Sequence, residues 1–260
     1  MKKWLWLLLL TSISAHAALR EQPVDYRAGD TTMKGYLVWD DSITGKRPGI
    51  LVVHEFWGLN DYARKRARML AELGYTALAV DMYGDGKVGS NPAEAMAMMN
   101  EVMGDMNLAK ARFLAARTLL EQQPTVAAGE IAAIGYCFGG TTVLNMARAG
   151  VDLKAVVSFH GLLNTKTPAQ PGQVKARVLV ETGADDPMAP PADVAALKQE
   201  MVAAGVDHEV HAYPGALHAF TNPAADSAGR MHNMPVAYNA AADKQSWQAM
   251  QDLFKRVFSH

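Results

Sequence analysis

The chain has 260 residues, of which 50% are hydrophobic and 20% are charged, and its formal net charge is −1. These values exclude a collagen-like repeat, a disordered polyelectrolyte and a protein with many membrane spans, and the balance of 25 basic and 26 acidic residues gives no basic footprint for a nucleic acid. The single cysteine, Cys137, excludes an intrachain disulfide and any zinc site that needs two cysteines of one chain.

The first 17 residues have the pattern of a secretory signal peptide. Two lysines precede an apolar run over residues 4–10, and Ala15 and Ala17 place small residues where a signal peptidase cuts. Polar residues interrupt this run before it reaches the roughly 20 residues that a bilayer requires. We therefore expect cleavage after Ala17, a mature chain of residues 18–260 that is periplasmic or secreted, and no stable membrane association.

The rest of the chain is predicted to form one domain in which strands and helices alternate. Two short strands at 24–28 and 33–39 flank a glycine-containing turn and predict an antiparallel hairpin. Apolar runs predict further strands at 49–53, 75–80, 131–135, 155–159, 177–182 and 208–213. Amphipathic stretches predict helices at 60–73, 92–122, 139–149, 191–204 and 243–258. This alternation is typical of an α/β fold whose mostly parallel sheet carries helices on both faces.

One segment, residues 221–239, is the least regular of the chain. It contains Pro223, Gly229 and Pro235 and directly follows His218. Loops in such a position usually shape a binding or catalytic site, so we expect this segment to border the site.

The segment around Cys137 is the strongest candidate for chemistry. Gly135 and Gly139 stand two residues on either side of it, between a predicted strand and a predicted helix, which is the pattern of a nucleophile elbow. Such a turn lifts the side chain above the sheet and places the next N–H, that of Phe138, at a helix N-terminus, where it helps to bind an oxyanion. A buried structural cysteine beside packing glycines would give the same local pattern.

Partners for the cysteine follow in the chain order nucleophile, acid, histidine that this kind of hydrolase uses. Asp185 and Asp186 come directly after one predicted strand, and His218 follows the next. Because the carboxyl ends of parallel strands meet at one edge of a sheet, these loops can converge on Cys137. Each residue alone has an ordinary alternative, a helix-capping acid or a surface histidine, but the joint order favours a triad.

Over residues 24–258 the sequence resembles the dienelactone hydrolase family of α/β-hydrolases. The resemblance is carried by HEFWG at 54–58, DMY at 81–83, GYCFGG at 135–140, GADDPMAP at 183–190 and HAF at 218–220. It implies the α/β-hydrolase fold, with Cys137 as the nucleophile and His218 as its base. The family's spacing between the catalytic aspartate and the following proline fits Asp186 better than Asp185, which implies that Asp186 is the acid that orients the imidazole.

The resemblance also implies two roles for the loop after the strand at 49–53. Glu55 matches a glutamate that contacts the nucleophilic thiol and helps to form the thiolate, and a carboxylate near a thiol and a histidine can accept a proton. Phe56 matches the residue that supplies a second oxyanion-hole N–H beside Phe138. A solvated loop acid is the alternative for Glu55.

The sequence departs from the family where the substrate is bound. Two family arginines bind a substrate carboxylate, but here Gly84 follows Tyr83, and Ala219 and Asn222 stand where the family's namesake has a serine and an arginine. The candidates for a replacement charge are the cationic residues Lys87, Arg230 and His232.

Several residues are predicted to line the substrate pocket without doing chemistry: Trp57, Tyr83, His160 and Phe220. Four methionines, Met96, Met99, Met103 and Met106, have helical spacing and predict one apolar face of the long helix at 92–122, packed against the site. A Cu(I) site is the rarer interpretation of such a stripe, and no metal-binding motif occurs, so we expect neither metal nor cofactor.

Together these patterns predict a hydrolase that cleaves an ester, lactone or thioester through an acyl-enzyme on Cys137, with a small-molecule ester or lactone as substrate. The alternative is a non-catalytic periplasmic binding protein that keeps the hydrolase scaffold. A thiol redox role lacks a resolving cysteine.

Overall fold

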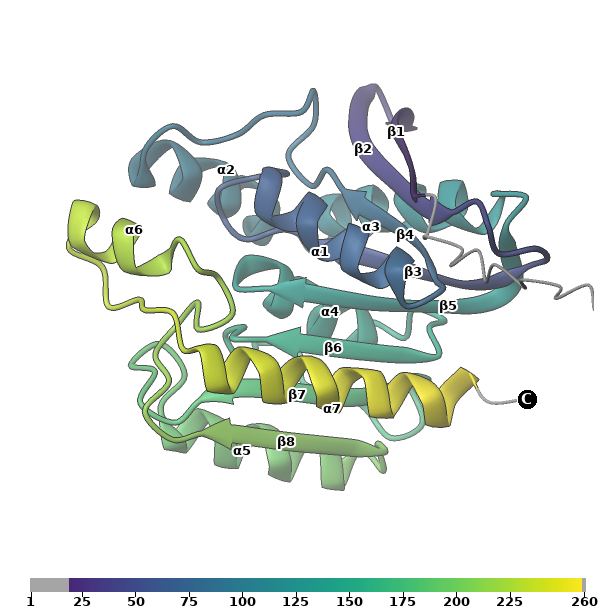
Figure 1. The fold of residues 1–260 in the computed structure, drawn as a ribbon. Helices are drawn as coiled ribbons and strands as arrows, with labels where there is room; N and C mark the ends of the chain where they lie inside the picture. Colours follow the sequence, from purple (N-terminus) through teal and green to yellow (C-terminus); the bar gives the residue numbers. More distant parts are fainter. Residues whose placement is uncertain (1–18, 259–260) are drawn as a thin grey trace, which may run out of the picture.

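Eight strands form one sheet in the order β1-β2-β4-β3-β5-β6-β7-β8 (Figure 1). The computed structural model describes residues 19–258, so the predicted signal peptide lies outside the described residues. The strands are β1 (Leu19–Ala28), β2 (Thr31–Asp40), β3 (Arg47–Val53), β4 (Thr76–Val80), β5 (Val126–Tyr136), β6 (Ala155–Phe159), β7 (Arg177–Gly183) and β8 (His208–Tyr213). From β4 and β3 through to β8 all neighbours are parallel, as predicted.

The predicted antiparallel hairpin is confirmed at one edge of the sheet. Ala28 pairs with Thr31 across a two-residue turn in which Gly29 has a positive φ of 58°, a conformation that costs glycine little. Both strands are longer than predicted, because most side chains of β1 are exposed and give no apolar signal at this edge.

Seven helices accompany the sheet in the described residues. They are α1 (Asp61–Glu72), α2 (Pro92–Gly104), α3 (Met106–Glu121), α4 (Phe138–Arg148), α5 (Pro191–Ala203), α6 (Ala225–His232) and α7 (Ala240–Phe258). Helices α1 and α7 cover one face, α3, α4 and α5 cover the other, and α2 and α6 project beyond the carboxyl ends of the parallel strands (Figure 1).

The core has two layers because successive side chains of a strand point to opposite faces of the sheet. In β3, Ile50 and Val52 pack in the layer of α1 and α7, whereas Leu51 and Val53 pack in the layer of α3 and α4. All four side chains are fully buried, which explains why this strand is a continuous apolar run in the sequence.

Two sequence predictions about helices are wrong. The predicted long helix at 92–122 is broken at Asp105, whose backbone is extended and whose side chain caps α3 by accepting hydrogen bonds from the N–H groups of Asn107 and Leu108. Residues 221–239 are not wholly irregular, because they contain the eight-residue helix α6. Gly104 followed by Asp105 was the available signal for the break, since glycine ends helices and aspartate begins them.

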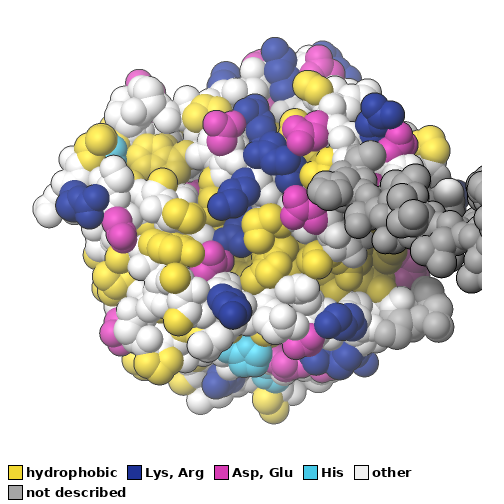
Figure 2. Space-filling view, in the orientation of Figure 1, with side chains coloured by type: hydrophobic (Ala, Val, Ile, Leu, Met, Phe, Trp, Pro, Cys, Tyr) yellow, Lys and Arg dark blue, Asp and Glu magenta, His cyan; other side chains and the backbone are white. Residues whose placement is uncertain are grey.

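The outer surface carries charges of both signs. On the face covered by α1 and α7, basic and acidic side chains are interspersed and form no continuous basic patch (Figure 2). No helix within residues 19–258 has the length and apolar character needed to cross a bilayer.

Candidate active site

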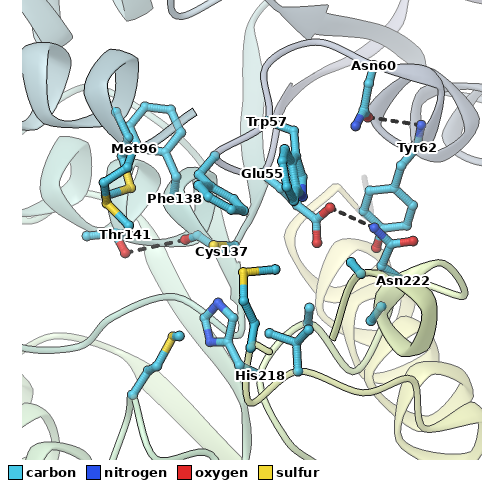
Figure 3. Close-up of a pocket in the computed structure, with 18 of the residues that line it drawn as sticks. Glu55, Trp57, Asn60, Tyr62, Met96, Cys137, Phe138, Thr141, His218 and Asn222 are labelled. Atoms are coloured by element: carbon cyan, nitrogen blue, oxygen red, sulfur yellow. Dashed lines mark hydrogen bonds between the residues drawn. The ribbon is translucent and has the colours of Figure 1, made fainter. Parts of the chain in front are cut away.

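A cavity of about 790 Å³ lies at the carboxyl edge of the sheet, between the strand ends and the projecting helices α2 and α6 (Figure 3). Its wall includes Cys137, His218, Glu55, Phe56 and Phe138, which the sequence singled out at separate positions. The remaining lining residues are Trp57, Asn60, Asp61, Tyr62, Met96, Met99, Asn100, Met103, Thr141, Leu162, Met188, Ala219, Asn222, Ala224, Ala225, Ala228, Met234 and Val236. The structure thus brings the proposed reacting groups to one cavity.

Cys137 occupies a strained turn between β5 and α4. Its φ of 55° and ψ of −115° are rare for a residue with a side chain, and its N–H donates to Phe159 O and to His160 Nδ1, at 3.0 Å each. The flanking glycines permit the close packing, because a Cβ on Gly135 would lie 2.1 Å from Gly139 O and one on Gly139 would lie 2.2 Å from Val53 O. The backbone therefore holds the thiol at the helix N-terminus, as a nucleophile elbow requires.

His218 and Asp186 form a buried pair beside the cysteine. Asp186 Oδ2 lies 2.9 Å from His218 Nδ1, and its Oδ1 accepts a hydrogen bond from the N–H of Met188 at 2.8 Å. The neighbouring Asp185 is exposed, so the structure places Asp186 and not Asp185 against the histidine. Nε2 of His218 is buried on the side of Cys137, and no described residue makes a geometrically regular hydrogen bond to it.

The electrostatics favour a charged His218. Burial alone would lower the pKa of its imidazole, but the negative charge of Cys137 in its ionised form and the hydrogen bond with Asp186 raise that pKa to about 10. A negative charge beside His218 therefore keeps its imidazole protonated near neutral pH.

The loop after β3 supplies the opposite wall. The ring of Phe56 packs on Trp57, with ring centroids 4.4 Å apart. The backbone carbonyl of Phe56 accepts a hydrogen bond of 2.8 Å from the Tyr83 hydroxyl. This bond orients the loop that carries the Phe56 N–H, while the Phe138 N–H is fixed by the first turn of α4. Phe56 and Phe138 both line the cavity with Cys137.

Glu55 differs from what the resemblance implied. Its Oε2 accepts a hydrogen bond of 2.7 Å from Asn222 Nδ2, and it makes no hydrogen bond to Cys137 in the described part of the chain. Burial raises the pKa of this carboxyl to about 7, although Asn222, His218 and Arg66 each act to lower it. The hydrogen bond of this buried carboxyl is thus made with an amide donor, which a desolvated carboxylate needs.

His160 lies behind the nucleophile rather than in the pocket wall. Because its Nδ1 accepts the N–H of Cys137, Nε2 carries the proton and donates to Thr221 Oγ1 at 2.7 Å. The Thr221 and Tyr62 hydroxyls share a further hydrogen bond of 2.5 Å. Burial, together with the charges of His218 and Arg66, lowers the pKa of His160 well below its usual value, so the ring is neutral and supports the elbow.

The other predicted pocket residues divide into two groups. Trp57 lines the cavity, whereas Tyr83 and Phe220 are buried behind its wall, so for them and for His160 the predicted lining role is wrong. Their positions at strand ends were right, but each side chain turns into the protein to meet a hydrogen-bond or ring partner.

Only three of the four methionines predicted to share one helix face do so. Met96, Met99 and Met103 of α2 line the cavity, while Met106 belongs to α3 and does not line it, because the helix breaks before it. Met188 and Met234, from the loops after β7 and α6, complete the thioether lining, and neither had any periodic signal in the sequence.

Sequence reasoning also missed residues that act through distant contacts. Tyr62 and Thr221 are 159 positions apart, and no local pattern connects them. Within residues 19–258 there is no cluster of three or more His, Cys, Asp or Glu side chains arranged to hold a metal ion.

Comparisons with known proteins agree with this architecture. A sequence model described as "Dienelactone hydrolase family" matches residues 33–258. A solved dienelactone hydrolase-like promiscuous phosphotriesterase from metagenomic libraries is 40% identical, with a TM-score of 0.88 over 94% of this chain and 100% of that one. A Yersinia pestis protein named "Putative carboxymethylenebutenolidase" is 29% identical over 237 residues, which are 85% of this chain and 83% of that protein.

A more distant structure shows the same fold. The dienelactone hydrolase of Anabaena variabilis is 22% identical, with a TM-score of 0.63 over 90% of this chain and 98% of that one. The family match and these relatives favour an enzyme over the alternative of a non-catalytic binding protein. The chain has the α/β-hydrolase fold and is a hydrolase that belongs to the dienelactone hydrolase family.

Proposed function

We propose that this protein hydrolyses an ester, lactone or thioester of a small molecule through a covalent acyl-enzyme on Cys137. The observation that carries the proposal is the buried Asp186–His218 pair, 2.9 Å between Oδ2 and Nδ1, beside a cysteine held in a strained elbow. The lactone-derived name of the Yersinia pestis relative supports the substrate class. No cofactor is needed for this chemistry.

The first half of the reaction forms the acyl-enzyme. The Cys137 thiolate attacks the carbonyl carbon and forms the C–S bond, and the negative charge moves to the carbonyl oxygen, where the N–H groups of Phe56 and Phe138 stabilise it. The C–O bond then breaks, and His218 Nε2–H gives its proton to the leaving alkoxide. Asp186 keeps the imidazole in the orientation this transfer needs.

The second half releases the acid. His218, now neutral, accepts a proton from water through Nε2, and the hydroxide forms the new C–O bond at the thioester carbon. The C–S bond breaks and the thiolate leaves next to the imidazolium, which restores the starting ion pair. In this scheme His218 forms the thiolate, and Glu55 acts through its hydrogen bond to Asn222.

We also propose that the enzyme works in the periplasm or outside the cell, with a small-molecule ester or lactone as partner. The support is the lysine-initiated apolar run and the small residues at Ala15 and Ala17. N-terminal sequencing of the protein purified from the periplasm and from the medium tests this, and Ala18 is the expected first residue. A protein that still begins at Met1 in both places would contradict the proposal.

A second candidate activity is hydrolysis of a phosphotriester. The 40% identical structure is named a promiscuous phosphotriesterase, and the oxyanion-binding amides suit a phosphoryl oxygen as well as a carbonyl oxygen. A thiolate that attacks phosphorus and expels an alkoxide would use the same residues. Turnover of a triester by the wild-type protein, lost in Cys137→Ala, is the expected result.

The decisive test of the mechanism is the covalent intermediate. With an aryl ester as substrate, rapid quenching and mass spectrometry should find the acyl group on the peptide that contains Cys137. Cys137→Ala should lose at least about 10³-fold in kcat/KM while keeping its melting temperature within a few degrees. Full turnover by the folded Cys137→Ala protein would show that the thiol is not the nucleophile.

A further inference from the structure

The cavity wall has an unusual charge composition. Within the described chain, none of the residues that line it is a lysine or an arginine, and the lining carboxyl groups are those of Glu55 and Asp61. The cationic residues that the sequence offered as replacements, Lys87, Arg230 and His232, do not line the cavity. A carboxylate on a bound ligand would therefore have no lysine or arginine of the wall to pair with.

Positive charge near the cavity already has partners. The imidazole of His218 is paired with Asp186, whose Oδ2 lies 2.9 Å from Nδ1. The guanidinium of Arg66 lies behind the wall, where it donates to Asp243 Oδ1 at 2.5 Å and to Thr221 O at 2.6 Å. Neither cation is available to a substrate without breaking a buried ion pair.

Much of the remaining cavity wall is apolar and consists of flexible methionine side chains. Five methionines face the cavity, and their unbranched thioethers adapt to aliphatic or aromatic groups of different shape. Met96 lies beside Phe138 and Thr141 on one side of Cys137, while Glu55, Asn222 and Tyr62 lie on the other side (Figure 3). An apolar group attached next to the scissile bond thus has a matching surface on the methionine side.

We infer that this site selects neutral esters or lactones with an apolar acyl group and discriminates against substrates that carry a carboxylate. The inference rests on the proposed function, and it names the substrate class of that same site. Its physical basis is desolvation: a carboxylate loses its water in the methionine-lined cavity and gains no counter-ion, whereas an alkyl or aryl group gains apolar contact.

The test compares two substrates that differ by one group. 4-Nitrophenyl hexanoate and the 4-nitrophenyl monoester of adipic acid have acyl chains of equal carbon number, with a methyl group replaced by a carboxylate. After each rate is divided by that for hydrolysis by hydroxide, the wild-type protein should prefer the neutral ester by at least about 100-fold in kcat/KM. Equal values for the two esters would overturn the inference.

A pair of lysine variants locates the selectivity in the cavity. Met96→Lys puts an ammonium group at the cavity wall, at a side chain that is 45% exposed and so tolerant of change. It should raise kcat/KM for the adipate ester about tenfold or more. Met231→Lys makes the same substitution on α6 outside the cavity, at a side chain 73% exposed, and should leave the preference unchanged.

The outcomes separate the two proposals. If the neutral ester is hydrolysed and Cys137 is acylated, but the adipate ester reacts equally fast, the selectivity is wrong and the mechanism stands. If neither ester acylates Cys137 in the folded protein, the proposed function fails. If Met231→Lys changes the preference as much as Met96→Lys, general surface charge explains the effect and the cavity wall does not determine it.

Discussion

The two sides of the cavity are built in different ways. On the reacting side, which consists of Cys137, Phe138, Asp186 and His218, helix α4 buries ten of its eleven residues. On the methionine side, formed by Met96, Met99 and Met103, helix α2 buries two of its thirteen residues, Ala95 and Val102. Groups that transfer protons need fixed positions, whereas a wall that receives an apolar group can adjust to it. Helix α4, on the side where bonds change, is thus much more deeply buried than α2.

The largest expected effect tests the rigidity of α4. Gly139→Ala places a Cβ 2.2 Å from Val53 O, and because that atom is backbone in the central strand, the protein should lose at least about 4 kcal/mol of unfolding free energy. Gly104→Ala in α2 meets no atom within 4 Å and should stabilise by about 0.5–1 kcal/mol. Urea unfolding measures both, and similar midpoints would remove the contrast between the two helices.

A large effect on rate is expected at the acid. Asp186→Asn removes the charge that orients His218 and stabilises its imidazolium, so kcat/KM for a neutral ester should fall about 10³-fold, or about 4 kcal/mol. Asp185→Asn changes the exposed neighbouring carboxylate and should keep activity within about threefold. A larger loss in Asp185→Asn than in Asp186→Asn would reassign the acid.

A smaller effect is expected at Glu55, on the boundary between the two sides. Its pKa is raised from 4.5 to about 7 in the folded protein, so the folded state binds a proton that the unfolded state releases between those values. The free energy of unfolding should therefore decrease as pH rises from about 4.5 to 7, by about 3 kcal/mol for this group.

Glu55→Gln keeps a hydrogen-bonding side chain but cannot ionise, so this contribution to the pH dependence should disappear. Urea unfolding of both proteins at several pH values gives the difference directly. Parallel curves for wild type and variant would mean that Glu55 is not a perturbed acid.

Local patterns in the sequence predicted much of this protein. Strands such as β3 and β6 are continuous apolar runs because both of their faces are buried. The glycines around Cys137 reveal the elbow because only a residue without Cβ fits at Gly135, against Gly139 O, and at Gly139, against Val53 O. Where a side chain is exposed, as along β1, or where one helix follows another at once, as at Asp105, the periodic signal is weak and the boundaries were missed.

The sequence by itself determined the alternation of strands and helices and made Cys137, an aspartate at 185 or 186 and His218 candidate partners, because these follow from periodicity and from loops at strand ends; the resemblance to the family then favoured Asp186. Only the tertiary structure decided that Glu55 bonds to Asn222, that His160 supports the elbow from behind, and that methionines from three segments form a wall without basic residues. Those outcomes depend on which distant side chains meet and how much water they lose, and no local stretch of the chain encodes either quantity.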